Sequence, residues 1–278
     1  MPSQFERALA FHALHQRPDC FVIPNPWDAG SAKALAALGF EALATTSAGL
    51  AFSLGRADGE GLISREETLA NAQTIVGATL LPVAADLENG FADSPQECAK
   101  TIHLAALAGL VGGSIEDASG VLEQPIYPFE LAVERIQAAA STARSLPFPF
   151  MLCARAENFL HGRPDLADTI RRLQAYAEAG ADVLYAPGLR SREEIVAVVR
   201  AVAPKPVNVV MGLDSLTLTV AELAELGVKR ISLGSSLARA AFGAFLRAAE
   251  EVQLHGSFDF AKQAAPFTRI NQLLGTAH

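Results

Sequence analysis

Residues 83–91 read VAADLENGF, an apolar run that ends in two carboxylates before an Asn-Gly pair. Continuous apolar residues are typical of a strand buried on both faces, as in a parallel sheet covered by helices. Residues i and i+2 of a strand share a face and lie about 7 Å apart, so Asp86 and Glu88 can approach one centre. The stretch therefore predicts a buried parallel strand with acidic side chains at its carboxyl end.

The same pattern recurs on both sides of this stretch, each time followed by a helical segment. We expect strands at 20–25, 41–47, 80–86, 111–117, 149–155, 181–187, 205–212 and 229–234. Helices are expected at 28–38, 64–78, 94–109, 128–144, 164–180, 191–202, 217–226 and 235–254. Asp28 and Ser94 are placed as helix caps, and Ser64 with Glu67 forms a capping box in sequence. Eight strand-helix units predict an α/β fold, a closed (β/α)8 barrel of the TIM type.

An open doubly wound sheet is the main competitor for this pattern. It would more often carry a glycine-rich phosphate-binding fingerprint after the first strand, where this chain has NPWDAGSA. We therefore expect residues 1–278 to form a single barrel domain. The segment 260–274 exceeds what a barrel needs, so residues 235–274 are expected to be C-terminal helices used in oligomerisation.

Composition excludes several classes of partner. The chain has 278 residues, of which 50% are hydrophobic, and a net charge of −8. Nucleic acid and anionic membranes require concentrated positive charge, so neither is an expected partner. No apolar run approaches the ~18 residues of a membrane span, and the N-terminus has no apolar signal core. Cys20, Cys98 and Cys153 match no zinc pattern and indicate reduced thiols in a cytoplasmic protein.

Chemistry in (β/α)8 barrels sits where strands end and loops begin. Polar side chains near these ends are Ser47, Asp58, Asp86, Glu88, Glu116, Asp117, Arg155 and Asn158. Carboxylates that converge on one mouth repel one another, and a hard divalent cation, Mg²⁺ or Mn²⁺, resolves that repulsion. Arg155 would clamp a substrate carboxylate bidentately. Capping of the following helix is an equally good interpretation of any single acid, but a weaker account of all of them together.

Lysine and histidine positions argue against two other classes of barrel enzyme. Lys205 and Lys229 open strands at the opposite face, and Lys33, Lys100 and Lys262 lie on helices. No lysine is therefore placed for a Schiff-base aldolase. None of the six histidines ends a strand, which disfavours histidine-ligated metallohydrolases.

The strand ends resemble, in order and spacing, those of the isocitrate lyase/phosphoenolpyruvate mutase superfamily. The matching pieces follow the first to fifth strands: NPWDAGSA, TTSAGLAFSLGRAD, AADLENG, SIED and CARAE. The resemblance implies a (β/α)8 barrel whose C-terminal helix is exchanged between subunits, in dimers that assemble into homotetramers. It also implies Mg²⁺-dependent cleavage or formation of a C–C or P–C bond beside a 2-oxo acid, through an enolate.

The same resemblance implies roles for individual residues. The metal set consists of Asp86 as the direct ligand, with Asp58, Glu88 and Glu116 on the metal's waters. The substrate-binding set consists of Ser47, Gly49, Leu50, Asp86 and Arg155, with Arg155 on the substrate carboxylate. The expected catalytic residues are Arg155, Glu116 and Asp58.

Two departures from the superfamily concern acid/base chemistry. Its lyases carry a Lys-Lys-Cys-Gly-His type motif on a gating loop after the fourth strand, and its mutases carry a lysine and an asparagine there. Residues 117–130, DASGVLEQPIYPFE, contain no Cys, Lys or His. Methylisocitrate lyases have a glutamate after a proline at the sixth strand, where this chain has Pro187 and Gly188. Tyr127, Glu123 and Gln124 are candidate replacements by position alone.

Two functions are therefore open. The first is a Mg²⁺-dependent carbon–carbon lyase or decarboxylase, acting through a metal-stabilised enolate on a small 2-oxo or 2-hydroxy di- or tricarboxylate. Oxaloacetate, isocitrate and methylisocitrate are the substrate types, and oxaloacetate decarboxylation suits the bare loop best because it needs little acid/base help. The second is a catalytically weak or inactive barrel that binds a 2-oxo acid such as 2-oxoglutarate or oxaloacetate.

Overall fold

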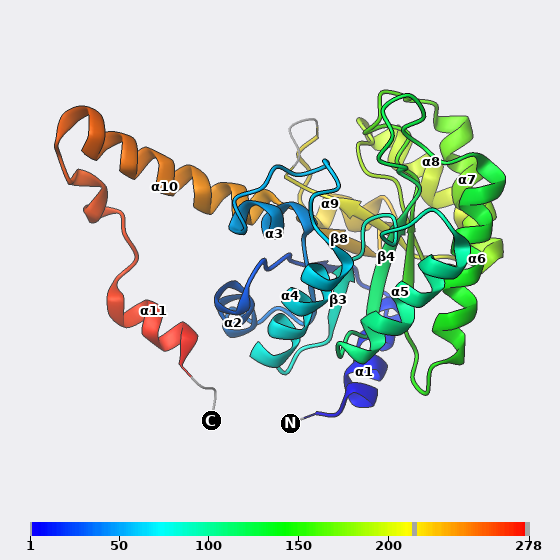
Figure 1. Ribbon diagram of the computed structural model, residues 1–278, viewed down its shortest axis with the longest axis horizontal. Coiled ribbons are helices and arrows are strands. Elements are labelled where there is room, and N and C mark those ends of the chain that lie inside the picture. Colours follow the sequence, from blue (N-terminus) through cyan, green and yellow to red (C-terminus); the bar gives the residue numbers. More distant parts are fainter. Residues whose placement is uncertain (1, 213–215, 276–278) are drawn as a thin grey trace.

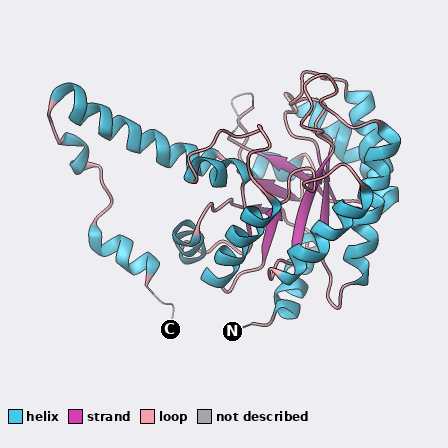
Figure 2. Cartoon of the chain, viewed as in Figure 1, coloured by secondary structure: helices cyan, strands magenta, loops and turns pink. Residues whose placement is uncertain are grey.

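Eight parallel strands form the centre of the computed structural model, which describes residues 2–212 and 216–275 (Figure 2). The strands are β1 (Phe21–Ile23), β2 (Leu43–Ala44), β3 (Val83–Asp86), β4 (Gly112–Glu116), β5 (Met151–Arg155), β6 (Val183–Tyr185), β7 (Val207–Val210) and β8 (Arg230–Ser232). Their order in the sheet is β1-β8-β7-β6-β5-β4-β3-β2. Each strand is shorter than the apolar run that predicts it, because only the central part of each run pairs with its neighbours.

The sheet closes between β1 and β2 through loop and side-chain contacts rather than a ladder. The backbone N of Ala44 donates to the carbonyl O of Pro24 at 3.1 Å. Asn25, directly after β1, donates from Nδ2 to the Thr45 carbonyl at 3.0 Å. Its Oδ1 accepts from the backbone N of Leu233 and of Gly234, each at 2.9 Å. One buried amide thus joins the ends of β1, β2 and β8, and the predicted (β/α)8 fold is confirmed.

Helices surround the strands (Figures 1 and 2). They are α1 (Gln4–Gln16), α2 (Ala29–Ala37), α3 (Ser47–Ser53), α4 (Arg65–Ala78), α5 (Pro95–Leu107), α6 (Phe129–Ser145), α7 (Leu166–Ala179), α8 (Arg192–Val202), α9 (Val220–Glu225), α10 (Ser236–His255), the 3-10 helix η1 (Asp259–Lys262) and α11 (Phe267–Leu274). The predicted caps are confirmed. Asp28 and Ser94 cap α2 and α5, and Ser64 forms a capping box with Glu67 at the start of α4.

The segment between β2 and α4 contains a helix, whereas the sequence predicts none between the strand 41–47 and the helix 64–78. This helix, α3, is capped by the Thr46 side chain, which accepts a hydrogen bond from the backbone N of Gly49 at 3.3 Å. A Cβ at Gly49 would lie 2.6 Å from Cγ2 of Thr46 and 2.9 Å from Cβ of Trp27. Close packing, rather than a turn, therefore requires this glycine, and a seven-residue helix is too short for its periodicity to stand out in the sequence.

Helix α1 closes the barrel at the amino ends of the strands. Its residues Ala8, Phe11 and Leu14 are buried in one cluster with Phe21 and Met151, the first residues of β1 and β5. The carboxyl ends of the strands are therefore left as the open mouth.

The C-terminal arm, residues 236–275, leaves the barrel (Figure 1). Helix α10 extends away from the strands, and the chain then turns back so that α11 contacts α2. Lys33 of α2 donates from Nζ to the carbonyl O of Leu274 at 3.3 Å. The arm exposes several large apolar side chains, namely Phe242, Phe245, Leu246, Leu254, Phe258, Phe267 and Ile270. Within 2–212 and 216–275, no helix combines the length and apolarity needed to cross a bilayer.

Candidate active site

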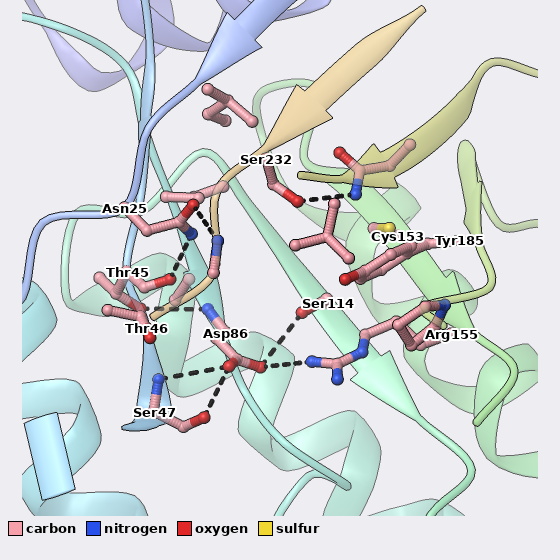
Figure 3. A pocket seen from close by; sticks show the side chains of 18 of the residues that line it. Asn25, Thr45, Thr46, Ser47, Asp86, Ser114, Cys153, Arg155, Tyr185 and Ser232 are labelled. Carbon is pink, nitrogen blue, oxygen red and sulfur yellow. Dashed lines mark hydrogen bonds and ion pairs between the residues drawn. The ribbon is translucent and has the colours of Figure 1, made fainter. Parts of the chain in front are cut away.

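A cavity of about 170 Å³ opens at the carboxyl ends of the strands (Figure 3). A cavity of about 150 Å³ already admits a benzene-sized molecule, so the space suits a small organic acid. Ser47, Asp58, Asp86, Ser114 and Arg155 line it near the strand ends. The mouth of the barrel is therefore polar, as the strand-end acids indicate.

Asp86, the last residue of β3, is the most connected side chain of this mouth. Its Oδ2 accepts from Ser47 Oγ at 2.7 Å and from Ser47 N at 3.3 Å. Its Oδ1 accepts from Arg155 Nη1 at 2.9 Å and from Ser114 Oγ at 3.5 Å. Figure 3 shows the side chains of Ser47, Ser114 and Arg155 pointing toward Asp86. The fold thus brings Ser47, Asp86 and Arg155 together, although they are far apart in sequence.

Arg155, the last residue of β5, contacts three carboxylates. In addition to Asp86, its Nη2 lies 3.0 Å from Oε2 of Glu116 and its Nε lies 2.9 Å from Oε1 of Glu157. These negative charges hold the pKa of the Arg155 guanidinium well above its usual value, against the opposing effect of burial. A guanidinium has five N–H donors, so Arg155 keeps donors for a further anion.

Glu88 does not line the cavity, although it is close enough for the charges of Asp86 and Asp58 to act on it. Strand β3 ends at Asp86, and Glu88 lies in the left-handed region at φ 47° rather than on the face of an extended strand. The turn is closed by a hydrogen bond from Gly90 N to the Leu87 carbonyl at 2.8 Å. The strand geometry predicted for Asp86 and Glu88 is therefore wrong. The turn that contains Asn89 and Gly90 begins at Leu87, so the chain is no longer extended at Glu88.

The carboxylates of the mouth oppose one another electrostatically. Burial, with the negative charges of Asp86 and Asp58, raises the pKa of Glu88 to about 7. Burial and the charge of Asp86 also raise the pKa of Asp58. Burial raises the pKa of Glu116 well above its usual range, and Arg155 only partly opposes this. One arginine therefore does not balance the acids, and a cation in this region would be stabilised.

These residues fit a hydrated hard cation. All the donors are carboxylate or hydroxyl oxygens, which Mg²⁺ prefers. In the described part of the chain, no three His, Cys, Asp or Glu side chains lie close enough to hold a metal ion directly. Mg²⁺ usually keeps several waters and uses only one or two carboxylates. The prediction that Asp86 binds the ion directly, with Asp58, Glu88 and Glu116 on its waters, is compatible with that requirement and stays a prediction.

Two expected substrate donors lie inside helix α3. The backbone N of Leu50 donates to the Thr46 carbonyl at 3.0 Å, and that of Gly49 donates to the Thr46 hydroxyl. Both residues are buried. Ser47 and Ala48, at the start of the same helix, line the cavity and present the helix N-terminus to it.

Asp117 and Asn158, also near strand ends, lie outside the cavity. The Asp117 carboxylate accepts from Glu157 N at 2.8 Å, from Tyr176 Oη at 2.6 Å and from Arg172 Nη1 at 3.1 Å. It therefore anchors the turn that follows Arg155. Asn158 is buried and donates from Nδ2 to Asp168 at 2.9 Å.

The loop 117–130 does not direct its acid/base candidates into the cavity. Tyr127 is buried, and its hydroxyl donates to Asp93 Oδ1 at 2.7 Å. Glu123 and Gln124 are exposed at the tip of the loop, whose two arms pair at Ala118 and Ile126. None of the three candidates lines the cavity.

Sequence reasoning missed several residues that complete the site. Glu157 is one: it is the last residue of the CARAE motif, two residues after Arg155, and pairs with it. Tyr185, Asn208 and Arg230 line the inner part of the cavity. They lie inside the apolar runs 181–187, 205–212 and 229–234, where Tyr185 is the last residue of β6, Asn208 lies within β7 and Arg230 is the first residue of β8. Alternation along β6, β7 and β8 was the only signal that could have placed them on the inner face.

Comparison with known proteins identifies the family. The phosphoenolpyruvate phosphomutase family model matches residues 11–253. The chain belongs to this family and, with it, to the isocitrate lyase/phosphoenolpyruvate mutase superfamily. The resemblance noted at the strand ends is thereby confirmed.

Three relatives show how far the similarity extends. A crystal structure from Burkholderia cenocepacia J2315, provisionally described as a lyase/mutase, is 59% identical with a TM-score of 0.95, covering 99% of this chain and 97% of its own. An uncharacterised protein of Mycobacterium tuberculosis is 35% identical over 232 residues, 82% of each chain. Oxaloacetate acetylhydrolase, solved with its product oxalate and with the inhibitor 3,3-difluorooxaloacetate, is 27% identical to this chain in the oxalate complex. That complex has a TM-score of 0.88 and covers 99% of this chain and 96% of its own.

Proposed function

We propose that this protein is a Mg²⁺-dependent carbon–carbon lyase or decarboxylase that acts on a small 2-oxo or 2-hydroxy acid, with oxaloacetate as the first candidate. The observation that carries the proposal is the convergence of Ser47, Asp86 and Arg155 on a cavity of about 170 Å³ among poorly balanced acids. The resemblance to oxaloacetate acetylhydrolase supports the same class of substrate.

Some residues of the site would bind the substrate, and others would hold the metal ion that balances its negative charge. Arg155 would hold the carboxylate next to the 2-oxo group, using N–H donors that its three ion pairs leave free. The Ser47 backbone N and hydroxyl, which donate to Asp86 in this conformation, would donate to the substrate once Asp86 holds the metal ion. A bound Mg²⁺ would polarise the 2-oxo group and balance the negative charge that bond cleavage leaves on its oxygen. Asp58, Glu88 and Glu116 would fix the waters around that ion.

The loop 117–130 favours a reaction that needs no general acid. Tyr127 is bonded to Asp93, and Glu123 and Gln124 are exposed, so none is positioned as a general acid in this conformation. Loss of CO₂ from oxaloacetate needs no such group to start, which makes it the preferred reaction. The same observation favours the second candidate, a barrel that binds a 2-oxo acid without turning it over.

A proton NMR time course with Mg²⁺ tests the proposal. Oxaloacetate, isocitrate, 2-methylisocitrate and 2-oxoglutarate are supplied separately, with Asp86→Ala as the control variant. Consumption of one acid above the metal-only rate, lost in Asp86→Ala, is the expected result, and the products identify the bond that breaks. Line broadening that depends on Asp86 without any product would favour the binding barrel. Neither broadening nor turnover would reject both functions for this class of acids.

A further inference from the structure

A row of four polar side chains crosses the interior of the barrel. In the register of the sheet, Arg155 lies beside Tyr185, Tyr185 beside Asn208, and Asn208 beside Arg230. All four line the same cavity. Arg155 is the last residue of β5 and Arg230 is the first residue of β8, so the row descends from the mouth toward the closed end. The cavity therefore has a cation at its mouth and another at its floor.

Arg230 is a buried cation that has no acidic partner in the part of the chain that the structure describes. It is 7% exposed, and its Nε donates to Oδ1 of Asn208 at 2.8 Å. Asn208 in turn donates from Nδ2 to Ser232 Oγ at 3.0 Å, which orients the amide. Among residues 2–212 and 216–275, no carboxylate forms an ion pair with Arg230. Burial and the charge of Arg230 lower the pKa of His15 to about 3, so this neighbour is neutral near pH 7 and supplies no counter-charge.

The two arginines of the cavity thus differ in charge balance. Arg155 contacts the carboxylates of Asp86, Glu116 and Glu157. Within the described residues, the hydrogen-bond partners of Arg230 are the neutral Asn208 amide and Cys153 thiol. Arginine stays protonated in proteins, and a buried charge without a partner costs free energy. An anion at the floor of the cavity would remove that cost.

We propose that Arg230, oriented by Asn208, binds the far carboxylate of a small dicarboxylic substrate. The inference rests on the proposed function, which places the 2-oxo acid portion at the mouth with Ser47 and Arg155. Because Asn208 engages Nε, the two terminal nitrogens of Arg230 remain to bind a carboxylate bidentately, beside the Cys153 thiol. Tyr185, between the two arginines in the row, faces the middle of such a substrate. The site therefore selects dicarboxylates over monocarboxylates.

Isothermal titration calorimetry with three probes in the presence of Mg²⁺ tests this site. The probe 3,3-difluorooxaloacetate has a 2-oxo group and two carboxylates, 2-oxobutyrate lacks the far carboxylate, and succinate lacks the 2-oxo group. Wild type is compared with Arg230→Met, a variant of similar volume without the charge. Arg200→Met, at an exposed arginine of α8, is the matched control.

We expect wild type and the control to bind the 2-oxo diacid at least about tenfold tighter than 2-oxobutyrate. Arg230→Met is expected to lose this preference while its affinity for 2-oxobutyrate is unchanged. The apo variant should also melt at or above the wild-type temperature, because an unpaired buried charge is gone. A purely structural role for Arg230 would instead lower the melting temperature and both affinities together.

The other outcomes distinguish a failure of the Arg230 carboxylate site from a failure of the proposed enzymatic function. Equal diacid affinity in wild type and Arg230→Met would overturn the far-carboxylate site and leave the proposed function standing. Arg230-dependent binding of succinate, without affinity for either 2-oxo acid, would keep the anion site and reject the function. Absence of binding by wild type to all three probes would overturn both. If Arg230→Met does not fold, Asn208→Leu takes its place, with selective loss of diacid affinity expected and unchanged affinity overturning the site.

Discussion

Nη1 of Arg155 lies 2.9 Å from Oδ1 of Asp86, and this contact joins the carboxyl ends of β5 and β3 across the mouth of the barrel. The same guanidinium contacts Glu116 and Glu157, so one side chain balances carboxylates from two strands and a loop. The residue expected to bind substrate is thus also the main counter-charge of the site.

Replacing Arg155 by Met should therefore destabilise the fold as well as remove substrate binding. Loss of one partner from a buried ion pair typically costs about 3–5 kcal/mol in the free energy of unfolding. The loss should be larger at pH 8 than at pH 5, because the carboxylates left behind can take up protons at low pH. Urea denaturation at both pH values measures it. Arg171→Met, at a side chain that is 58% exposed and pairs with Asp168, should cost less than about 1 kcal/mol.

Glu88→Gln should stabilise the protein at high pH in the absence of metal. The pKa of Glu88 is raised from 4.5 to about 7, so the folded state binds this proton more tightly than the unfolded state. That stabilising effect is present in full below pH 4.5 and is lost as the pH rises through 7. The variant should thus melt roughly 2–4 °C above wild type at pH 8 for each kcal/mol of relieved repulsion, and show little gain at pH 5. Differential scanning calorimetry in EDTA measures this, and a gain independent of pH, or shared by exposed Glu134→Gln, would contradict it.

Tyr176→Phe should lower stability without changing substrate affinity. The Tyr176 hydroxyl donates to the buried Asp117 carboxylate at 2.6 Å, outside the cavity. Leaving that acceptor with one fewer donor should cost about 1–3 kcal/mol. Chemical denaturation and calorimetric titration of the same sample separate the two effects. A large loss of affinity at unchanged stability would show that the Asp117 anchor acts on the site and not on the fold.

The apolar side chains of the C-terminal arm are expected to be covered by a second copy of the chain. Phe245, Phe258 and Phe267 are 64%, 67% and 81% exposed, and clustered exposure of this kind marks interaction surfaces. Phe267→Glu should shift the molar mass from light scattering toward that of the monomer. Leu122→Glu, at a loop tip that is 93% exposed, is the control and should leave the mass unchanged. A monomeric wild type would reject the oligomer.

Local patterns in the sequence determined most of the fold. Apolar runs alternating with capped helices predict the eight strand-helix units, because burial on both faces and the satisfaction of free backbone N–H groups act over only a few residues. The acids at the ends of β3 and β4 and Arg155 at the end of β5 were found in the same way, since strand ends meet at one edge of a parallel barrel.

Only the tertiary structure decided how these groups are paired. Glu88 leaves the extended conformation and does not line the cavity, and Tyr127 turns away from the cavity toward Asp93. The row from Arg155 to Arg230 depends on the register of four strands, which is set by packing around the whole barrel. Within β8, Arg230 is one charged residue at the start of an apolar run and resembles a surface residue. Its place at the floor of the cavity follows from closure of the sheet, a long-range constraint that local sequence patterns do not contain.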